Sequence, residues 1–311
     1  MKVIEPQTIS GDRLVSTNAV ADDILPYDPA TTYQPGVDGA EGDRAVEGTE
    51  IYEAVAEVTG VLPSVGEQQE PKKWVLVSSL NQWAMFNGVI GDATESSEPL
   101  PVHEGAGIQA VIRPGRVVNA LALFGIEGAN AVRVEVLSGG EVVYDTTRSL
   151  RSTVGINSYY AWFFEPIERE ADAVFTNLPS YNADIRITIT ATTDTAKCGL
   201  CVVGRMRQLG LTQWGVSTGI MSFSRRVRDD FGRIRLLKRD NAKLASFDVS
   251  VDGNRSNALA RYLAKYDSTP LVWIGAEQYE PMLIYGFYED YRLVYTHLAF
   301  HECTIDIVGL T

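Results

Sequence analysis

The chain has few residues of the kinds that crosslink a fold or carry acid–base chemistry, with three cysteines and three histidines among 311 residues. An odd number of cysteines in a chain of this length argues against a disulfide framework and fits a reducing compartment. No apolar run approaches the roughly 18 residues that a membrane-spanning helix needs, and the first residues lack the apolar core of a signal peptide. We therefore expect a protein that is made in the cytosol and does not insert into a membrane.

Charge is unevenly distributed along a chain whose composition is otherwise that of an ordinary globular protein. Hydrophobic residues make up 45% of the sequence, which is enough to bury sizeable cores in two or three domains. The net charge is −13, and residues 1–110 alone hold 18 acidic against 5 basic side chains. The acidity therefore belongs to one end of the chain, and the remainder is balanced.

A basic segment lies within the balanced part. Residues 205–243 carry ten arginines and lysines. Complementary acidic and basic surfaces steer and orient association, so we predict a protein interface between copies. The alternative is that both charged regions are solvated faces. The arginines predicted to form the interface are Arg225, Arg226, Arg228, Arg233 and Arg235.

Short alternating strands fill the middle of the chain. The runs lie at residues 108–112, 117–126, 132–137, 142–145, 159–164 and 185–190. This period-two pattern, with turn signals about every 8–12 residues, is typical of an antiparallel β-sandwich. No His, Cys or acidic cluster among these strands suggests chemistry, so the block indicates a binding or building module.

The same block resembles a known family. Residues 81–87 (NQWAMFN), 113–124 (RPGRVVNALALF) and 160–166 (YAWFFEP) are similar to the galactose-binding-like jelly rolls built into tail proteins of tailed bacteriophages. The likeness covers roughly residues 80–210. It implies a jelly-roll β-sandwich in a virion protein.

The chain divides into four segments by composition and pattern. We predict an extended leader with one short strand over residues 1–22, a small β unit over 23–80, the jelly roll over 81–210 and an α+β assembly domain over 211–311. The predicted fold class is therefore mainly β, with a small N-terminal β module, a jelly-roll sandwich and a sheet-rich α+β unit that carries one helix.

The unit at residues 23–80 is similar to small chitin-binding-type carbohydrate modules in the spacing of its aromatic, Gly and Pro residues. That family stacks sugar rings on exposed aromatic residues, and this chain has Val-Ala-Glu at residues 55–57 where one of them should follow. We therefore expect the aromatic residues of the unit to form its core. These residues are Tyr33, Tyr52 and Trp74.

The last hundred residues have a different pattern. Apolar side chains at i, i+3, i+4 and i+7 after a Ser or Asn cap predict a helix over residues 256–266. We predict strands at residues 234–237, 244–251, 270–275, 282–288, 291–295 and 298–308, with a bend or turn at the Glu-Asp pair 289–290. With the phrases Phe-Ser-Arg at 223–225 and Asp-Phe-Gly at 230–232, the unit resembles parts of phage baseplate and distal tail proteins that build rings around the tail axis.

One short motif matches a hydrolase signature. Gly215, Ser217 and Gly219 form a G-x-S-x-G, which in hydrolases places a nucleophilic serine on a turn between a strand and a helix. The flanking residues do not predict that strand and helix, and only His297 and His301 lie downstream as possible bases. We interpret the motif as a Gly-rich turn between domains and expect no enzymatic activity.

The cysteines suggest a metal site on paper. Cys198 and Cys201 form a C-x-x-C, and His301 and Cys303 lie two apart on the last predicted strand. On a strand, Cys198 and Cys201 would point to opposite faces, and the same stretch is typical of a buried strand that closes the sandwich. We favour packed free thiols and predict no metal and no cofactor.

Other candidate ligands and bases give weaker patterns. Asp92, Glu95 and Glu98 are spaced too irregularly for a calcium site and favour a solvated loop. His103 next to Glu104 is interpreted as a loop histidine, because no second carboxylate follows at a suitable spacing.

Two functions follow from these patterns. The first is a structural component of a tailed-phage virion, a tail-tip, baseplate or fibre-attachment protein assembled in the host cytoplasm with copies of itself and other tail proteins. Direct contact with nucleic acid is not expected, because a basic lining would bind phosphates and hinder DNA transit. The alternative is a carbohydrate-binding protein whose jelly-roll loops recognise host surface glycans by stacking and hydrogen bonds. The candidate sugar-binding residues are Asn157, Tyr159, Tyr160, Asn177 and Tyr181.

Overall fold

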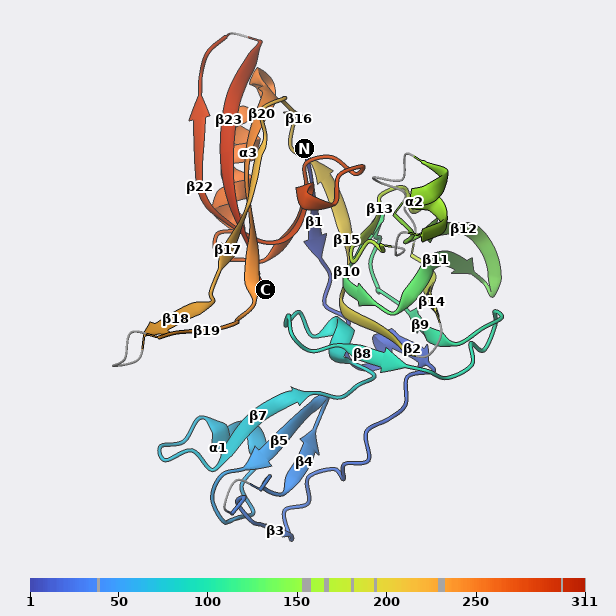
Figure 1. Ribbon diagram of the computed structural model, residues 1–311, viewed down its shortest axis with the longest axis vertical. Helices are drawn as coiled ribbons and strands as arrows, with labels where there is room; N and C mark the ends of the chain where they lie inside the picture. The colour runs from blue at the N-terminus through green and yellow to red at the C-terminus, as the bar shows by residue number, and fades with distance from the viewer. Residues whose placement is uncertain are drawn as a thin grey trace.

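The structure is mainly β, as the sequence predicts. It is a computed structural model and describes residues 1–37, 40–152, 158–164, 168–179, 182–192, 195–228, 233–297 and 299–310. Figure 1 shows a small N-terminal module at the bottom, a β-sandwich on the right and a tall C-terminal sheet at the upper left. Neighbouring strands in the described sheets run antiparallel. None of the described helices is long and apolar enough to cross a membrane.

The β-sandwich predicted for the middle of the chain is present. One sheet has the strand order β12-β11-β14-β9-β2, and the facing sheet contains β13-β10-β15 with β8 paired to β15. Alternate side chains of both sheets, such as Leu121, Val134 and Ile187, are buried between them, which is the reason for the period of two in the sequence. The first sheet consists of β2 (Leu14–Thr17), β9 (Gly107–Ile112), β11 (Ala129–Ser138), β12 (Glu141–Ser149) and β14 (Asp184–Ala191). The facing strands are β8 (Thr94–Ser96), β10 (Ala120–Glu127), β13 (Ala173–Phe175) and β15 (Ala196–Gln208).

The second sheet of the sandwich continues without a break into the C-terminal half. Strand β1 (Lys2–Pro6) pairs with β15 on one side and with β21 (Leu271–Ile274) on the other. The sheet then runs on through β22 (Leu283–Val294), β23 (Phe300–Gly309) and β20 (Asn241–Asp252) to the short β16 (Leu211–Thr212) and β17 (Ser217–Ser222). Residues 1–22 contain two strands where one was expected, because β2 joins the edge of the first sheet as well. Strand β1 lies in the middle of an 11-stranded sheet that joins residues on both sides of position 210.

The long sheet buries side chains on both faces. On β1, Val3 packs into the core beneath helix α3 (Ser256–Lys265), whereas its neighbour Ile4 packs into a second core against residues of the sandwich strands β10 and β15. Trp273 and Val272 of β21 divide in the same way. Because successive side chains of a strand point to opposite faces, a run of apolar residues on these strands marks burial on both sides.

Helix α3 confirms the predicted helix at residues 256–266. Leu259 and Leu263, four residues apart, are its buried contacts with the sheet. The expected Ser or Asn cap is wrong in detail: a 3₁₀ turn, η3 (Gly253–Arg255), precedes the helix, and the carboxylate of Asp252 accepts the hydrogen bond that caps this turn from the Asn254 N–H. The two strands predicted at 282–288 and 291–295 are one strand, β22, whose register shifts between Tyr288 and Asp290 at the expected bend.

The N-terminal module has the aromatic core that the sequence predicts. Tyr33, Tyr52 and Trp74 are buried, and the Tyr33 and Trp74 ring centroids lie 5.0 Å apart in an edge contact. The Trp74 indole N–H donates to the Val61 carbonyl at 3.1 Å, which satisfies its one polar group. The module consists of β3 (Thr32–Tyr33), β4 (Arg44–Glu47), β5 (Glu50–Ala54), β6 (Val58–Thr59), α1 (Pro63–Glu67) and β7 (Trp74–Ser79). Short 3₁₀ turns elsewhere are η1 (Gly11–Arg13), η2 (Ala84–Phe86) and η4 (Glu280–Met282).

One predicted strand of the middle block is wrong. Residues Tyr159–Phe164 form a short helix, α2, in which the Trp162 N–H donates to the Ser158 carbonyl at 3.0 Å. The segment joins none of the described sheets. A strand without a neighbour leaves its backbone groups unpaired, whereas one helical turn satisfies some of them locally. The aromatic run therefore forms a helical turn, because no neighbouring strand is in place to pair with it.

Candidate functional site

The predicted interface arginines gather on a projecting hairpin. In the part of the chain that the structure describes, strands β18 (Arg225–Arg228) and β19 (Ile234–Leu237) pair only with each other, and they extend away from the C-terminal sheet at the left of Figure 1. We call these two strands the arm. Arg225, Arg226, Arg228 and Arg235 lie on it, and Arg233 comes directly before β19. Every residue of the two strands is exposed.

Both faces of the arm combine charge with aliphatic surface. Residues directly opposite in an antiparallel pair share a face, and so do residues two apart on one strand. The register pairs Arg226 with Leu236 and Arg228 with Ile234, which puts these four side chains on one face. The other face carries Arg225, Val227, Arg235 and Leu237. Ile234 and Leu236 are each 65% exposed, an uncommon state for large aliphatic side chains that lie side by side on one face of a strand pair.

The five candidate sugar-binding residues are only partly described. Tyr159 and Tyr160 lie on α2, and both are strongly exposed together with Trp162, Phe163 and Phe164. Asn177 is exposed after β13. Asn157 and Tyr181 lie outside the described residues. Sugar binding by the loops of the sandwich therefore stays a prediction.

The four candidate metal ligands are divided between two cores. Cys198 and Cys201 are buried in the sandwich, whereas Cys303 is buried beneath α3, on the same strand as His301. The described residues contain no cluster of three or more His, Cys, Asp or Glu side chains that could hold a metal ion. Burial raises the pKa of the Cys198 thiol to about 12 and that of Cys303 to about 11, so these groups are poor nucleophiles and poor ligands.

The expectation that Cys198 and Cys201 point to opposite faces is wrong. Both belong to the sandwich core, as do Leu123 and Ile126 on the paired strand β10. The alternation of side chains between the two faces is interrupted at Gly125, whose φ of +62° only glycine adopts readily. Gly125 lies opposite Gly199 on β15. The irregularity on both strands turns two residues three apart toward the same core.

The G-x-S-x-G motif does not form a nucleophile elbow. Ser217 begins β17 and pairs with Ser246 of β20, so a strand follows it where an elbow needs a helix. Asp92 also has a structural role, because its carboxylate accepts hydrogen bonds from the Ser79 N–H and the Asn87 amide at 3.1 and 2.8 Å.

His103 has a carboxylate partner that sequence spacing could not reveal. Its Nε2 lies 2.9 Å from Oε2 of Glu135, a residue on the outer face of β11 whose side chain is only 3% exposed. Arg133 lies 3.2 Å from Nδ1 of His103 and can only donate, so Nδ1 accepts and the Nε2–H donates to Glu135. Arg186 also donates to Glu135 at 3.2 Å. The network pins the loop around His103 onto the sheet.

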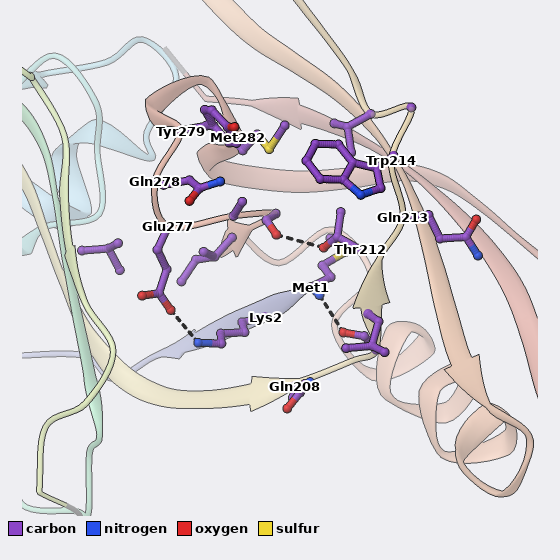
Figure 2. Close-up of a pocket in the computed structure, with 18 of the residues that line it drawn as sticks. Met1, Lys2, Gln208, Thr212, Gln213, Trp214, Glu277, Gln278, Tyr279 and Met282 are labelled. Atoms are coloured by element: carbon purple, nitrogen blue, oxygen red, sulfur yellow. Dashed lines mark hydrogen bonds and ion pairs between the residues drawn. The ribbon is translucent and has the colours of Figure 1, made fainter. Parts of the chain in front are cut away.

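The structure also forms a cleft that the sequence analysis missed. It measures about 880 Å³ and lies where loops at one end of the long sheet meet the edge of the sandwich. The loop between β16 and β17 supplies Trp214, and the loop after β21 supplies Glu277, Gln278 and Tyr279 (Figure 2). The signals in the sequence were Gln213, Trp214 and Gln278 in turn segments. The sequence alone does not show that these segments lie close together in space.

Two hydrogen bonds fix the loops of the cleft. The Thr212 hydroxyl donates to the Gly275 carbonyl at 2.9 Å, and the Gln213 N–H donates to the Asp248 carbonyl at 2.7 Å. Glycine at position 275 also lets the Phe247 ring pack against the backbone there, because a Cβ at this position would lie 2.2 Å from that ring. Trp214 follows directly and is 91% exposed. The indole is therefore presented to solvent from an anchored loop.

One wall of the cleft carries two opposite charges that form an ion pair. Oε1 of Glu277 accepts hydrogen bonds from Nζ of Lys2 at 2.5 Å and from the Thr176 hydroxyl at 3.0 Å. Burial opposes ionisation of Glu277, but Lys2, Thr176 and Arg148 outweigh it and lower the pKa of this carboxyl. The carboxylate therefore stays charged and oriented at neutral pH.

A scan against protein-family models and a search of curated proteins both find no match for this chain. The resemblance to phage tail proteins therefore rests on the residues that carry it and stays a prediction.

Proposed function

We propose that this protein is a structural subunit of a tailed-phage virion, at the tail tip, the baseplate or a fibre attachment, and that it acts by assembling with copies of itself and other tail proteins. The phage assignment is supported by the residue patterns at 81–87, 113–124 and 160–166. The mode of action is supported above all by one observation, the exposed arm with arginines and aliphatic side chains on both faces.

The arm has the properties of a surface that is buried on association. A two-stranded hairpin is marginally stable alone in water, and this one leaves four aliphatic side chains exposed. Burying a side chain of that size is worth about 1.5–3 kcal/mol. Contact with a partner along both faces would thus offset a sizeable part of the entropy lost on association. The four side chains are Val227, Ile234, Leu236 and Leu237.

The partner surface that complements the arm is the acidic N-terminal module of a neighbouring copy. The module exposes both carboxylates and aliphatic side chains, which match the arginines and aliphatics of the arm. Exposed acidic residues there include Asp28, Glu41, Asp43, Glu57 and Glu70. Exposed aliphatic residues there include Leu62, Val65, Val75 and Val77. A contact between the arm of one copy and the module of the next is heterologous, the type that forms rings.

Charge reversal on the arm tests the proposal. The variant with Arg225, Arg226 and Arg228 changed to Glu should run as a monomer in size-exclusion chromatography with light scattering, while the unchanged protein forms a ring or another oligomer. The matched control reverses three exposed basic residues of the α3 region, Arg255, Arg261 and Lys265, and should still assemble. Raising the salt concentration should weaken assembly of the unchanged protein, because salt screens exposed charges.

Two results would contradict the proposal. Assembly of the arm variant at physiological salt, with a melting temperature equal to that of the unchanged protein, would exclude docking through these arginines. A protein that stays monomeric at all accessible concentrations would exclude self-assembly as its mode of action.

A further inference from the structure

We infer that the cleft beside Trp214 is a binding site for an uncharged oligosaccharide. The inference rests on the geometry of the cleft and is independent of the arm. A volume of about 880 Å³ falls within the range of about 300–1,000 Å³ that is usual for small-molecule sites.

The exposed indole of Trp214 supplies the first element of such a site. Tryptophan is usually well buried, and 91% exposure on a loop held by two hydrogen bonds leaves a large rigid apolar face without a partner in the described chain. In the view of Figure 2, Tyr279 and Met282 lie on the same rim as Trp214. An apolar face of this kind suits the C–H face of a sugar ring.

Side-chain amides supply the second element. Gln208, Gln213 and Gln278 all line the cleft, and none of these amides has a hydrogen-bond partner among the described residues. A primary amide offers donors and an acceptor at once, so it can bind a hydroxyl group in either sense. Several amides next to an aromatic face therefore match the alternation of hydroxyl groups and C–H surface around a sugar.

The charges of the cleft favour a neutral ligand. Lys2 and Glu277 form an ion pair, and Arg148 donates to Glu170 at 2.8 Å. The Met1 amino group, whose pKa is lowered to about 6 by burial, donates to the Gly210 carbonyl at 2.6 Å. Each basic group that lines the cleft therefore already has a partner among the described residues. Both hydrogen bonds to Glu277 use Oε1, and Oε2 has no partner among the described residues. This free carboxylate oxygen can accept from a ligand hydroxyl, and it would repel a carboxylate or phosphate.

The test is isothermal titration calorimetry, guided by an array of neutral and acidic oligosaccharides. We expect the array to show binding of neutral glycans, and the strongest of them is then titrated against the unchanged protein. Trp214→Ala should weaken its binding about tenfold or more, since loss of about 1.4 kcal/mol corresponds to tenfold. Trp162→Ala, which removes another exposed tryptophan on α2, is the matched control and should bind as the unchanged protein does.

Each other outcome overturns the inference. These outcomes are an array empty at millimolar glycan, a preference for sialylated or phosphorylated glycans, and equal binding by Trp214→Ala and the unchanged protein. A loss shared by Trp162→Ala would move the site to α2. Trp214→Ala should also assemble normally, and the variant reversed at Arg225, Arg226 and Arg228 should still bind the glycan, so the two proposals can fail separately.

Discussion

Replacement of Ile4 by Ala tests whether the two halves of the molecule form one cooperative unit. Ile4 is fully buried, and its neighbours across the sheet are Met206 on β15 and Val272 on β21. The change removes three carbon groups worth about 0.8 kcal/mol each on burial. The cavity left in a shared core raises the loss to about 3–4 kcal/mol of unfolding free energy.

Urea titration measures the loss of unfolding free energy, and hydrogen exchange read out by mass spectrometry shows which parts of the chain lose protection. Protection of peptides from β10 in the sandwich and from β22 in the C-terminal half should fall together, because β1 bonds to both parts of the sheet. Leu25→Ala is the control, since Leu25 is 80% exposed and its loss should change the free energy by less than about 0.5 kcal/mol. A loss of protection confined to one half, or a destabilisation below about 1 kcal/mol, would refute a shared core.

Two further predictions concern buried polar groups. The three free thiols should not react with a disulfide reagent at pH 8 in the folded protein and should all react in urea. The reason is that burial raises the pKa of Cys198 to about 12, that of Cys303 to about 11 and that of Cys201 well above its usual value. Rapid labelling of the native protein would contradict their burial. Glu135→Gln should lower the unfolding free energy by about 3 kcal/mol, because Arg186 loses its buried counter-ion. The exposed neighbour Glu104→Gln should have almost no effect in the same urea titration, and equal values for the two variants would show that the network around His103 adds no stability.

Strand positions were predictable where the pattern was local. Alternation in residues 108–112 and 132–137 reports burial on one face of a sheet, and the spacing of Leu259 and Leu263 reports one face of a helix. The same reasoning failed for residues 159–164. A short aromatic run is compatible with a strand and with a helical turn, and only the presence of a partner strand decides between them. It also failed for Cys198 and Cys201, where Gly125 on the opposite strand changes the face.

The candidate sites divide in the same manner. The arginines of the arm are neighbours in the sequence, so their clustering could be predicted from the sequence. The cleft unites Lys2, Gln208, Trp214 and Glu277 from four separate segments, and Glu135 reaches His103 from another strand. Composition and periodicity report the forces that act on each residue, and they determined the β class, the single longer helix, the aromatic core of the N-terminal module and the basic segment. Pairing between distant strands depends on chain closure and packing, so only the tertiary structure decided that β1 joins both halves and that two anchored loops form a cleft.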